Sequence, residues 1–163
     1  MSTLTSLAAG YTAGRTAGSV PYLVDVLIDF AAAATEKGTT LAAADIIECI
    51  NVPANTLILN AGIEVLTVTG GESSDTTYDL GVTTTEPDNF VDGFDGDAAA
   101  AGAYAQNAAA FQPLVVGATA DTIDITIATA TTAPTSGVAR VWAVLMNIDG
   151  RILADEVDRD QLA

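Results

Sequence analysis

The segment from Tyr22 to Phe30, YLVDVLIDF, has an alternation that constrains the fold more than any other feature of the chain. Tyr, Val, Val, Ile and Phe occupy every second position, and both aspartates fall on the positions between them. Side chains of a strand point alternately to the two faces of a sheet. The pattern therefore predicts a β-strand with one apolar face.

Other runs rich in β-branched and aromatic residues predict further strands, separated by turn signals of Gly, Pro, Asn and Asp. These runs are 45–52, 56–69, 76–82, 111–116, 122–129 and 137–148. Gly62 interrupts the second of them and is expected to introduce a bulge or a bend. No β-α-β alternation and no internal repeat is visible. The predicted fold is all-β, an antiparallel β-sandwich or jelly roll of roughly seven or eight strands.

The in-phase apolar positions of the clearest strands give the predicted core. They are Val24, Val26, Ile28, Leu57, Leu59, Ile123, Ile125, Ile127, Trp142 and Val144. Two segments are harder to assign. The alanine-rich residues 31–44 are compatible with either a short helix or a connection. Residues 86–110 have Pro, Gly and no clear period, so we expect a long loop there, with a short helix over 98–110 as an alternative.

The domain organisation follows from these patterns. Residues 1–19 are small, polar and dotted with glycine, which predicts a flexible N-terminal arm. Residues 20–150 form the predicted sandwich domain, and 151–163 a short charged tail. The arm contains one charged side chain, Arg15.

The charge of the chain is strongly negative, with 21 Asp and Glu against 5 Lys and Arg and a formal net charge of −16. Phosphate backbones and anionic membrane surfaces repel such a chain, so we expect neither nucleic acid nor membrane as a partner. Half of the residues are nevertheless hydrophobic, which hints at self-association or docking on another protein. No run approaches the ~20 apolar residues of a membrane span, and no signal peptide is recognisable, so synthesis in a host cytoplasm is expected.

The absence of histidine excludes most catalytic arrangements. The chain has no histidine and one cysteine, so it cannot form a Ser–His or Cys–His pair or a histidine-based metal site. Cys49 lies in an apolar run and is expected to be buried like a small hydrophobic residue. A carboxylate pair for glycoside hydrolysis remains conceivable chemically, but nothing in the sequence singles one out. The chain is therefore predicted not to be an enzyme.

A stretch rich in Asp and Gly, DNFVDGFDGD at 88–97, concentrates hard oxygen donors. Calcium takes six to eight such oxygens, and the candidate ligands are Asp92, Asp95 and Asp97. The spacing does not fit an EF-hand, because Phe90 and Ala99 stand where ligands are needed. The alternative is that these residues simply form turns. No other cofactor is expected.

Five stretches, in this order, resemble a family of small virion proteins of tailed phages that decorate the capsid or are minor head components. They are VPANTLILNAGIEVLTVTGG, YDLGVT, PDNFVDGFDGD, ADTIDITI and GVARVWAVLMNIDG, within residues 20–150. The resemblance implies a cement protein on the outer capsid surface of the virion, bound to the major capsid protein and, by analogy, assembled as a homotrimer. It supplies no catalytic residues.

The candidate contacts with the capsid or with other copies are Tyr11, Arg15 and Tyr22. The alternative function is a tail, fibre or glycan-binding β module of the virion. A glycan binder displays exposed aromatic side chains, and the aromatics expected in loops are Phe90, Phe94 and Tyr104. These residues keep the alternative open.

Overall fold

The computed structural model describes residues 3–4, 20–68, 76–82, 86–96, 100–106 and 112–148. Within them the chain forms ten strands and one helix. In chain order these are β1 (Thr3–Leu4), β2 (Tyr22–Asp29), α1 (Phe30–Lys37), β3 (Ile46–Val52), β4 (Thr56–Thr67), β5 (Thr76–Val82), β6 (Glu86–Asp95), β7 (Tyr104–Gln106), β8 (Leu114–Val116), β9 (Asp121–Ala130) and β10 (Val138–Asn147).

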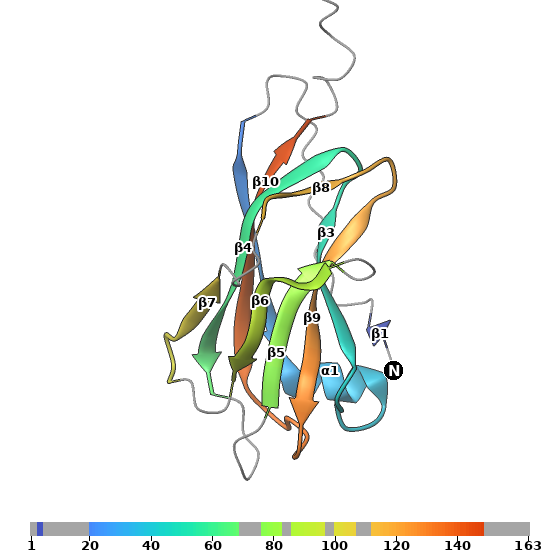
Figure 1. Ribbon diagram of the computed structural model, residues 1–163. Helices are drawn as coiled ribbons and strands as arrows, with labels where there is room; N and C mark the ends of the chain where they lie inside the picture. The colour runs from blue at the N-terminus through green and yellow to red at the C-terminus, as the bar shows by residue number, and fades with distance from the viewer. Residues whose placement is uncertain are drawn as a thin grey trace, which may run out of the picture.

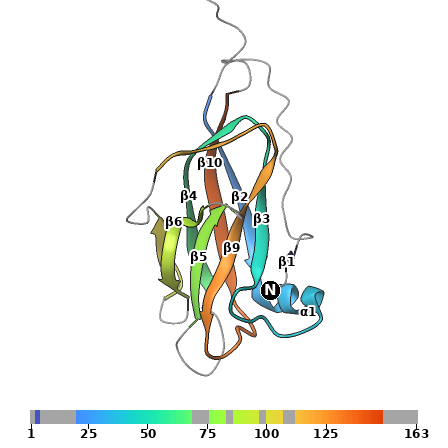
Figure 2. The ribbon, with the colours of Figure 1, turned by 45° about the vertical axis from the view of Figure 1, so that its right-hand side comes forward.

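Two sheets pack face to face, which confirms the predicted sandwich (Figures 1 and 2). We name them sheet A, in the order β1-β3-β9-β5-β6, and sheet B, in the order β2-β10-β4-β7 with β8 also paired to β4. All pairings are antiparallel except that of β1 with β3. Of the predicted arm, the structure describes only Thr3–Leu4, and the predicted tail 151–163 lies outside the described residues.

One hydrophobic core fills the space between the sheets. The predicted core residues that it contains are Val24, Ile28, Ile123, Ile125 and Ile127, with Val26 packed against it and partly buried. Tyr78 and Leu80 of β5 complete the inner face of sheet A, and both are about 1% exposed. The alternation in β2 and β9 therefore identified the inward faces of these strands correctly.

The core residues that were predicted for β4 and β10 are wrong. Leu57, Leu59, Trp142 and Val144 are only half-buried. The buried apolar positions are instead Ile58, Ala61, Ile63 and Val65 in β4, and Ala139, Val141, Ala143 and Leu145 in β10. Both faces of these strands are apolar, so alternation alone does not tell the inner face from the outer one, and a shift of one residue exchanges them.

Trp142 lies on the outer face of sheet B, opposite Gly62 of β4. A Cβ atom at Gly62 would lie 2.7 Å from Cζ2 of the indole and 2.8 Å from the Ala105 carbonyl oxygen. The glycine is needed because the ring and a neighbouring strand approach its backbone this closely. Of the predicted bulge or bend at Gly62, the bulge is wrong, since the β4–β10 register is continuous there and shifts instead between Val138 and Ala139 and between Val144 and Leu145.

Helix α1 confirms the helical alternative for residues 31–44. Asp29 caps the helix, because its Oδ1 accepts hydrogen bonds from the backbone N–H groups of Ala31 at 2.9 Å and Ala32 at 3.1 Å. The helix ends at Gly38, whose φ of 76° is a left-handed conformation that glycine adopts without steric cost.

The first helical residue, Phe30, was expected to end the preceding strand. It is 1% exposed and stacks on Tyr78 of sheet A, with ring centroids 5.0 Å apart. Ala33, one turn later, is also buried. The helix therefore closes one end of the sandwich (Figure 1).

Residues 86–110 are not a long loop, because β6 pairs with β5 and β7 pairs with β4. The period of β6 is lost in the sequence because its register against β5 shifts twice. As a result the neighbouring residues Phe90 and Val91 are both buried. Tyr104–Gln106 is a strand, so the alternative of a helix over 98–110 is wrong for the described residues.

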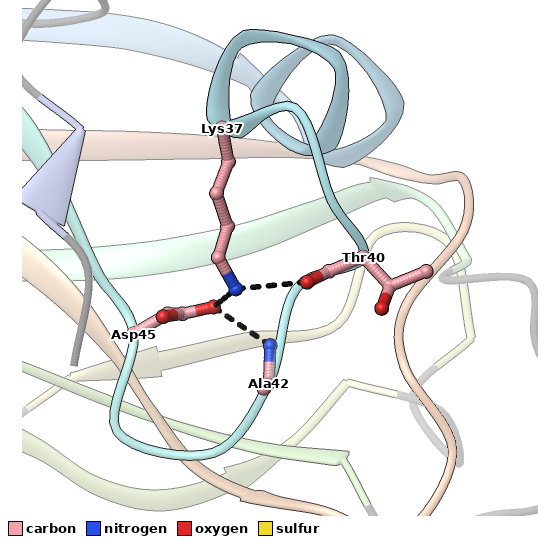
Figure 3. Close-up of polar contacts among 4 residues, drawn as sticks. All are labelled: Lys37, Thr40, Ala42 and Asp45. Atoms are coloured by element: carbon pink, nitrogen blue, oxygen red, sulfur yellow. Dashed lines mark hydrogen bonds and ion pairs between the residues drawn. The ribbon is translucent and has the colours of Figure 1, made fainter.

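The connection from α1 to β3 is held by a buried ion pair between Lys37 and Asp45, whose side chains are 13% and 4% exposed (Figure 3). Lys37 Nζ also donates a hydrogen bond to the Thr40 carbonyl oxygen at 2.8 Å. Asp45 Oδ2 accepts another from the Ala42 backbone N–H at 2.7 Å. Each charge thus has a second partner, which offsets the loss of its hydration.

No helix in the described part of the chain combines the length and the apolar character that crossing a membrane requires.

We expect Gly62→Ala to lower the free energy of unfolding by about 1–3 kcal/mol, because the added methyl group overlaps Trp142 and a backbone carbonyl. Gly117→Ala is the matched control, since a Cβ at Gly117 meets nothing within 4 Å. Thermal unfolding followed by the fluorescence of Trp142, the one tryptophan of the chain, measures both variants. Equal losses in the two variants would contradict the close contact.

Asp45→Asn is expected to lower the free energy of unfolding by about 3 kcal/mol, because it leaves Lys37 buried opposite a neutral amide. Glu36→Gln removes an exposed carboxylate from the same helix and should change stability by less than about 0.5 kcal/mol. Urea unfolding followed by circular dichroism compares the two. Unchanged stability of the Asp45 variant would show that the ion pair does not hold the connection.

Candidate functional site

The predicted cation ligands Asp92 and Asp95 lie in strand β6, where both are exposed. Together with Phe94 and Gln106 they line an open depression of about 330 Å³ between β6 and β7. Asp97 lies outside the described residues. Among the residues that the structure places, no three His, Cys, Asp or Glu side chains are arranged to hold a metal ion. Calcium binding therefore remains a prediction, and it requires Asp97 as a further ligand.

An acidic patch surrounds Asp79 on the outer face of sheet A. Burial is the main cause that raises the pKa of Asp79, and the negative charges of Asp92 and Asp88 add to it. A hydrogen bond from the Gly93 backbone N–H to Asp79 Oδ1, 2.8 Å long, acts in the opposite direction. The protonated form of Asp79 is thus favoured in the folded protein relative to an ordinary aspartic acid.

Asp79 is not among the residues that line the depression between β6 and β7. Cys49 is fully buried, and this burial raises the pKa of its thiol far above the usual range. Its Sγ donates a hydrogen bond to the Ile47 carbonyl oxygen at 3.1 Å. The prediction that Cys49 is a structural hydrophobic residue is confirmed.

The predicted contact residues are only partly within the described chain. Tyr22 begins β2, is half-buried and packs against the core. Tyr11 and Arg15 lie outside the described residues. Their role at the capsid remains a prediction.

The aromatic residues that kept a glycan-binding function open are mostly unavailable to a ligand. Phe90 is fully buried, and Phe94 is half-buried and packs against the core. Tyr104 alone of the three is well exposed, at 67%. A sugar-binding platform normally needs several exposed rings, so the described residues do not favour this alternative.

The two outer faces of the sandwich differ in character. The outer face of sheet A presents Glu48 and Asp79, with Asp88 and Asp92 near its β6 edge. Asp124 pairs with Glu48 in register but is buried. The basic side chains in the described residues are Lys37, used in the buried ion pair, and Arg140, which lies on sheet B. The outer face of sheet A is therefore strongly acidic.

Sheet B presents apolar side chains instead. Leu23 and Leu27 of β2 are 66% and 57% exposed, and Trp142 of β10 is half-buried beside them. The sequence indicated that the two leucines share a face with Asp25, but not that this face joins further apolar residues. The missing information was the pairing of β2 with the outer face of β10.

Comparison with known proteins gives a match in fold alone. No protein-family model matches the chain, and no curated protein matches it in sequence. Among solved structures, a chain of the cyanophage Pam1 capsid asymmetric unit matches with a TM-score of 0.61 and 16% identity, covering 84% of this chain and 91% of that one.

Two further matches come from phages of other hosts. A chain of the Ralstonia phage GP4 capsid has a TM-score of 0.56 and 16% identity, covering 85% of this chain and 90% of that one. A chain of the acidic stable capsid structure of Helicobacter pylori bacteriophage KHP30 has a TM-score of 0.52 and 16% identity, covering 78% and 87%. The chain therefore has the same β-sandwich fold, over most of its length, as chains found in three phage capsid structures.

Asp79→Asn is expected to raise the melting temperature at pH 7. Because the pKa of Asp79 is raised in the folded state, the folded protein binds this proton more tightly, and stability falls as pH rises from about 3.9 through the raised value. The advantage of the variant should shrink near pH 3, where Asp79 is protonated in both states. Asp25→Asn, whose carboxylate lies 3.8 Å from Arg140 Nε, is the control and should give no gain. A lower melting temperature of Asp79→Asn at pH 7 would contradict this account.

Proposed function

We propose that this chain is a structural protein of a tailed-phage virion that decorates the capsid. The observation that supports this most directly is the shared fold with chains of three phage capsid structures, each match covering 87–91% of the other chain. Whole-length agreement means that the compared chains are similar in size and consist of the same sandwich. The order of motifs within residues 20–150 also resembles small phage virion proteins that decorate the capsid or are minor head components.

The proposed position is the outer face of the major capsid protein shell. A net charge of −16 and an acidic outer face on sheet A fit a surface turned to solvent, because packaged DNA would repel such a protein inside the shell. The proposed role is mechanical. A cement protein joins neighbouring shell subunits and raises the force needed to separate them, and it needs no catalytic group.

Two features of the chain would help it to join subunits. Assembly as a homotrimer would place three copies at one point of the lattice, so that one assembly contacts several shell subunits. Residues 1–19, with Tyr11 and Arg15, would extend the reach of each copy, since an extended segment of this length spans on the order of 60 Å. Arg15 could bind a carboxylate of the shell, and Tyr22 lies where the arm joins the sandwich.

The test uses phage particles that lack the protein, to which the purified chain is added back. We expect the chain to bind at a fixed number of copies per particle and to raise the temperature at which the particles release DNA. A variant without residues 1–19 should bind at lower occupancy and give a smaller rise. Electron microscopy counts the bound copies, and a DNA-binding dye measures release.

The two parts of this proposal fail in different ways. Absence of binding by the full chain, or its appearance on the tail instead of the shell, would contradict the decoration role. Full occupancy and undiminished heat resistance with the shortened chain would contradict the role of the arm while leaving decoration intact.

A further inference from the structure

The outer face of sheet B has apolar side chains along most of β10 and on both of its margins. Strand register places its side chains in rows that run across β2, β10, β4 and then β7 or β8. The rows, from one end to the other, are Leu27–Arg140–Glu64–Tyr104, then Asp25–Trp142–Gly62–Gln106, then Leu23–Val144–Asn60, then Met146–Leu57–Val115. Three of the four rows have apolar side chains on β10.

The charges of this face are gathered at one end and nearly cancel. Arg140 Nη1 lies 3.4 Å from Glu64 Oε2, and Arg140 Nε lies 3.8 Å from Asp25 Oδ2. Two carboxylates and one guanidinium leave a local charge near −1. The remaining rows toward the other end, with Val144 and Met146 on β10, have no charged side chain.

The most exposed apolar side chains lie along the two margins of the face. Leu23 and Leu27 stand on β2, which pairs only with β10 among the described strands, and they are 66% and 57% exposed. On the opposite margin Tyr104 of β7 and Val115 of β8 are 67% and 55% exposed. Apolar margins of this kind are unusual on a surface that stays in water.

Electrostatics indicates what covers this face. Two copies of a chain with a net charge of −16 repel each other, so they can meet only where the local charge is low. The outer face of sheet A does not meet this condition, because Asp79, Asp88 and Asp92 gather there. The outer face of sheet B does, and it also offers apolar surface to bury.

The dimensions of the face fit an arrangement of three copies. Four strands at about 4.8 Å spacing make the face about 19 Å wide, and the ten residues of β10 make it about 33 Å long. If three such faces close a triangular prism, each lies about 5–6 Å from the central axis. This is half of the ~10 Å at which packed sheets lie, so side chains would fill the interior.

The area of the outer face of sheet B is also large enough for a three-copy assembly. Each copy would bury roughly 600 Å² of sheet surface, divided between its two neighbours, so the three copies together would bury about 1,800 Å², which is within the usual range for one stable assembly. The interface would have an apolar interior and a charged rim at the Arg140 end, as stable interfaces commonly do.

We propose that three copies of the chain associate through the outer faces of sheet B to form a triangular β-prism. Around the axis the β2 margin of each copy meets the β7–β8 margin of the next, so the contact is head-to-tail and closes after three copies. Leu27 of one copy then lies beside Tyr104 of the following copy, because both belong to the same row. Trp142, Val144 and Met146 face the axis. This inference rests on the self-association that is part of the proposed function.

The first test is the oligomeric state of the purified full-length chain by sedimentation equilibrium. We expect a trimer, and we expect Leu23→Asp and Val144→Asp each to raise the dissociation constant at least about a hundredfold, because a buried unpaired carboxylate opposes assembly. Ala128→Asp is the matched control, since Ala128 is exposed on β9 of sheet A, and it should leave the trimer intact. Circular dichroism verifies that each variant is folded.

The second test locates the margins and does not depend on weakening the assembly. A variant with both Leu27→Cys and Tyr104→Cys, treated with a short bifunctional thiol reagent, should yield covalently linked trimers. Each single variant should remain unlinked or nearly so, and Cys49 does not interfere because it is fully buried.

The outcomes separate this inference from the proposed function. A wild-type chain that is monomeric at all concentrations, or variants on sheet B that remain trimeric, would overturn the prism even if the chain binds particles. Cross-linking that stops at dimers would overturn the three-copy ring. If Leu23→Asp abolishes shell binding without changing the oligomeric state, the face docks on the shell and not on another copy.

Discussion

The packing of the two sheets against each other determines what every other part of this molecule can do. At the centre of sheet B the inward residues are small, with Ala61 paired to Ala143 in register. The inward residues of sheet A are larger, among them Ile125 and Tyr78. Small residues opposite large ones allow the layers to interdigitate at normal density. Burial of the alanine face turns the other face of β10, with its larger side chains, outward.

Because the alanine face of β10 is buried, its larger side chains determine the character of the outer face of sheet B. The indole of Trp142 packs closely against Gly62 of β4 on the outer face of sheet B, and only a glycine leaves room for it. Sheet A, in contrast, exposes carboxylates that face solvent. A sandwich with one apolar and one acidic outer face presents chemically different surfaces on its two sides. Such a sandwich can associate through the apolar face while the acidic face stays in contact with water.

Much of the fold could be predicted from the sequence, because β9 has one apolar and one polar face, and because the inner face of β2 is apolar throughout while its outer face also contains aspartates. The inner face of β10 could not be predicted, since Val141 and Val144 are equally apolar and only the partner strands decide which is buried. Strand β6 was missed for a related reason. Its register shifts bury Phe90 and Val91 together and destroy the period-two pattern.

The candidate site was less predictable than the fold. Asp92 and Asp95 form no ligand set within the described residues, because a strand spreads its side chains and does not wrap them around an ion. The apolar face of sheet B depends on residues from five strands that are far apart in the sequence. No short sequence pattern predicts such a surface. The leucines that alternate with the aspartates of β2 were the one local indication that its outer face is partly apolar.

The most direct measurement of the central claim is a cryo-electron microscopy map of the native particle in which this chain is found. We expect density for the β-sandwich on the outer surface of the capsid shell, in contact with more than one shell subunit and with the acidic face of sheet A turned to solvent. Density for the sandwich inside the shell, on the tail, or on a single shell subunit without neighbours would contradict it.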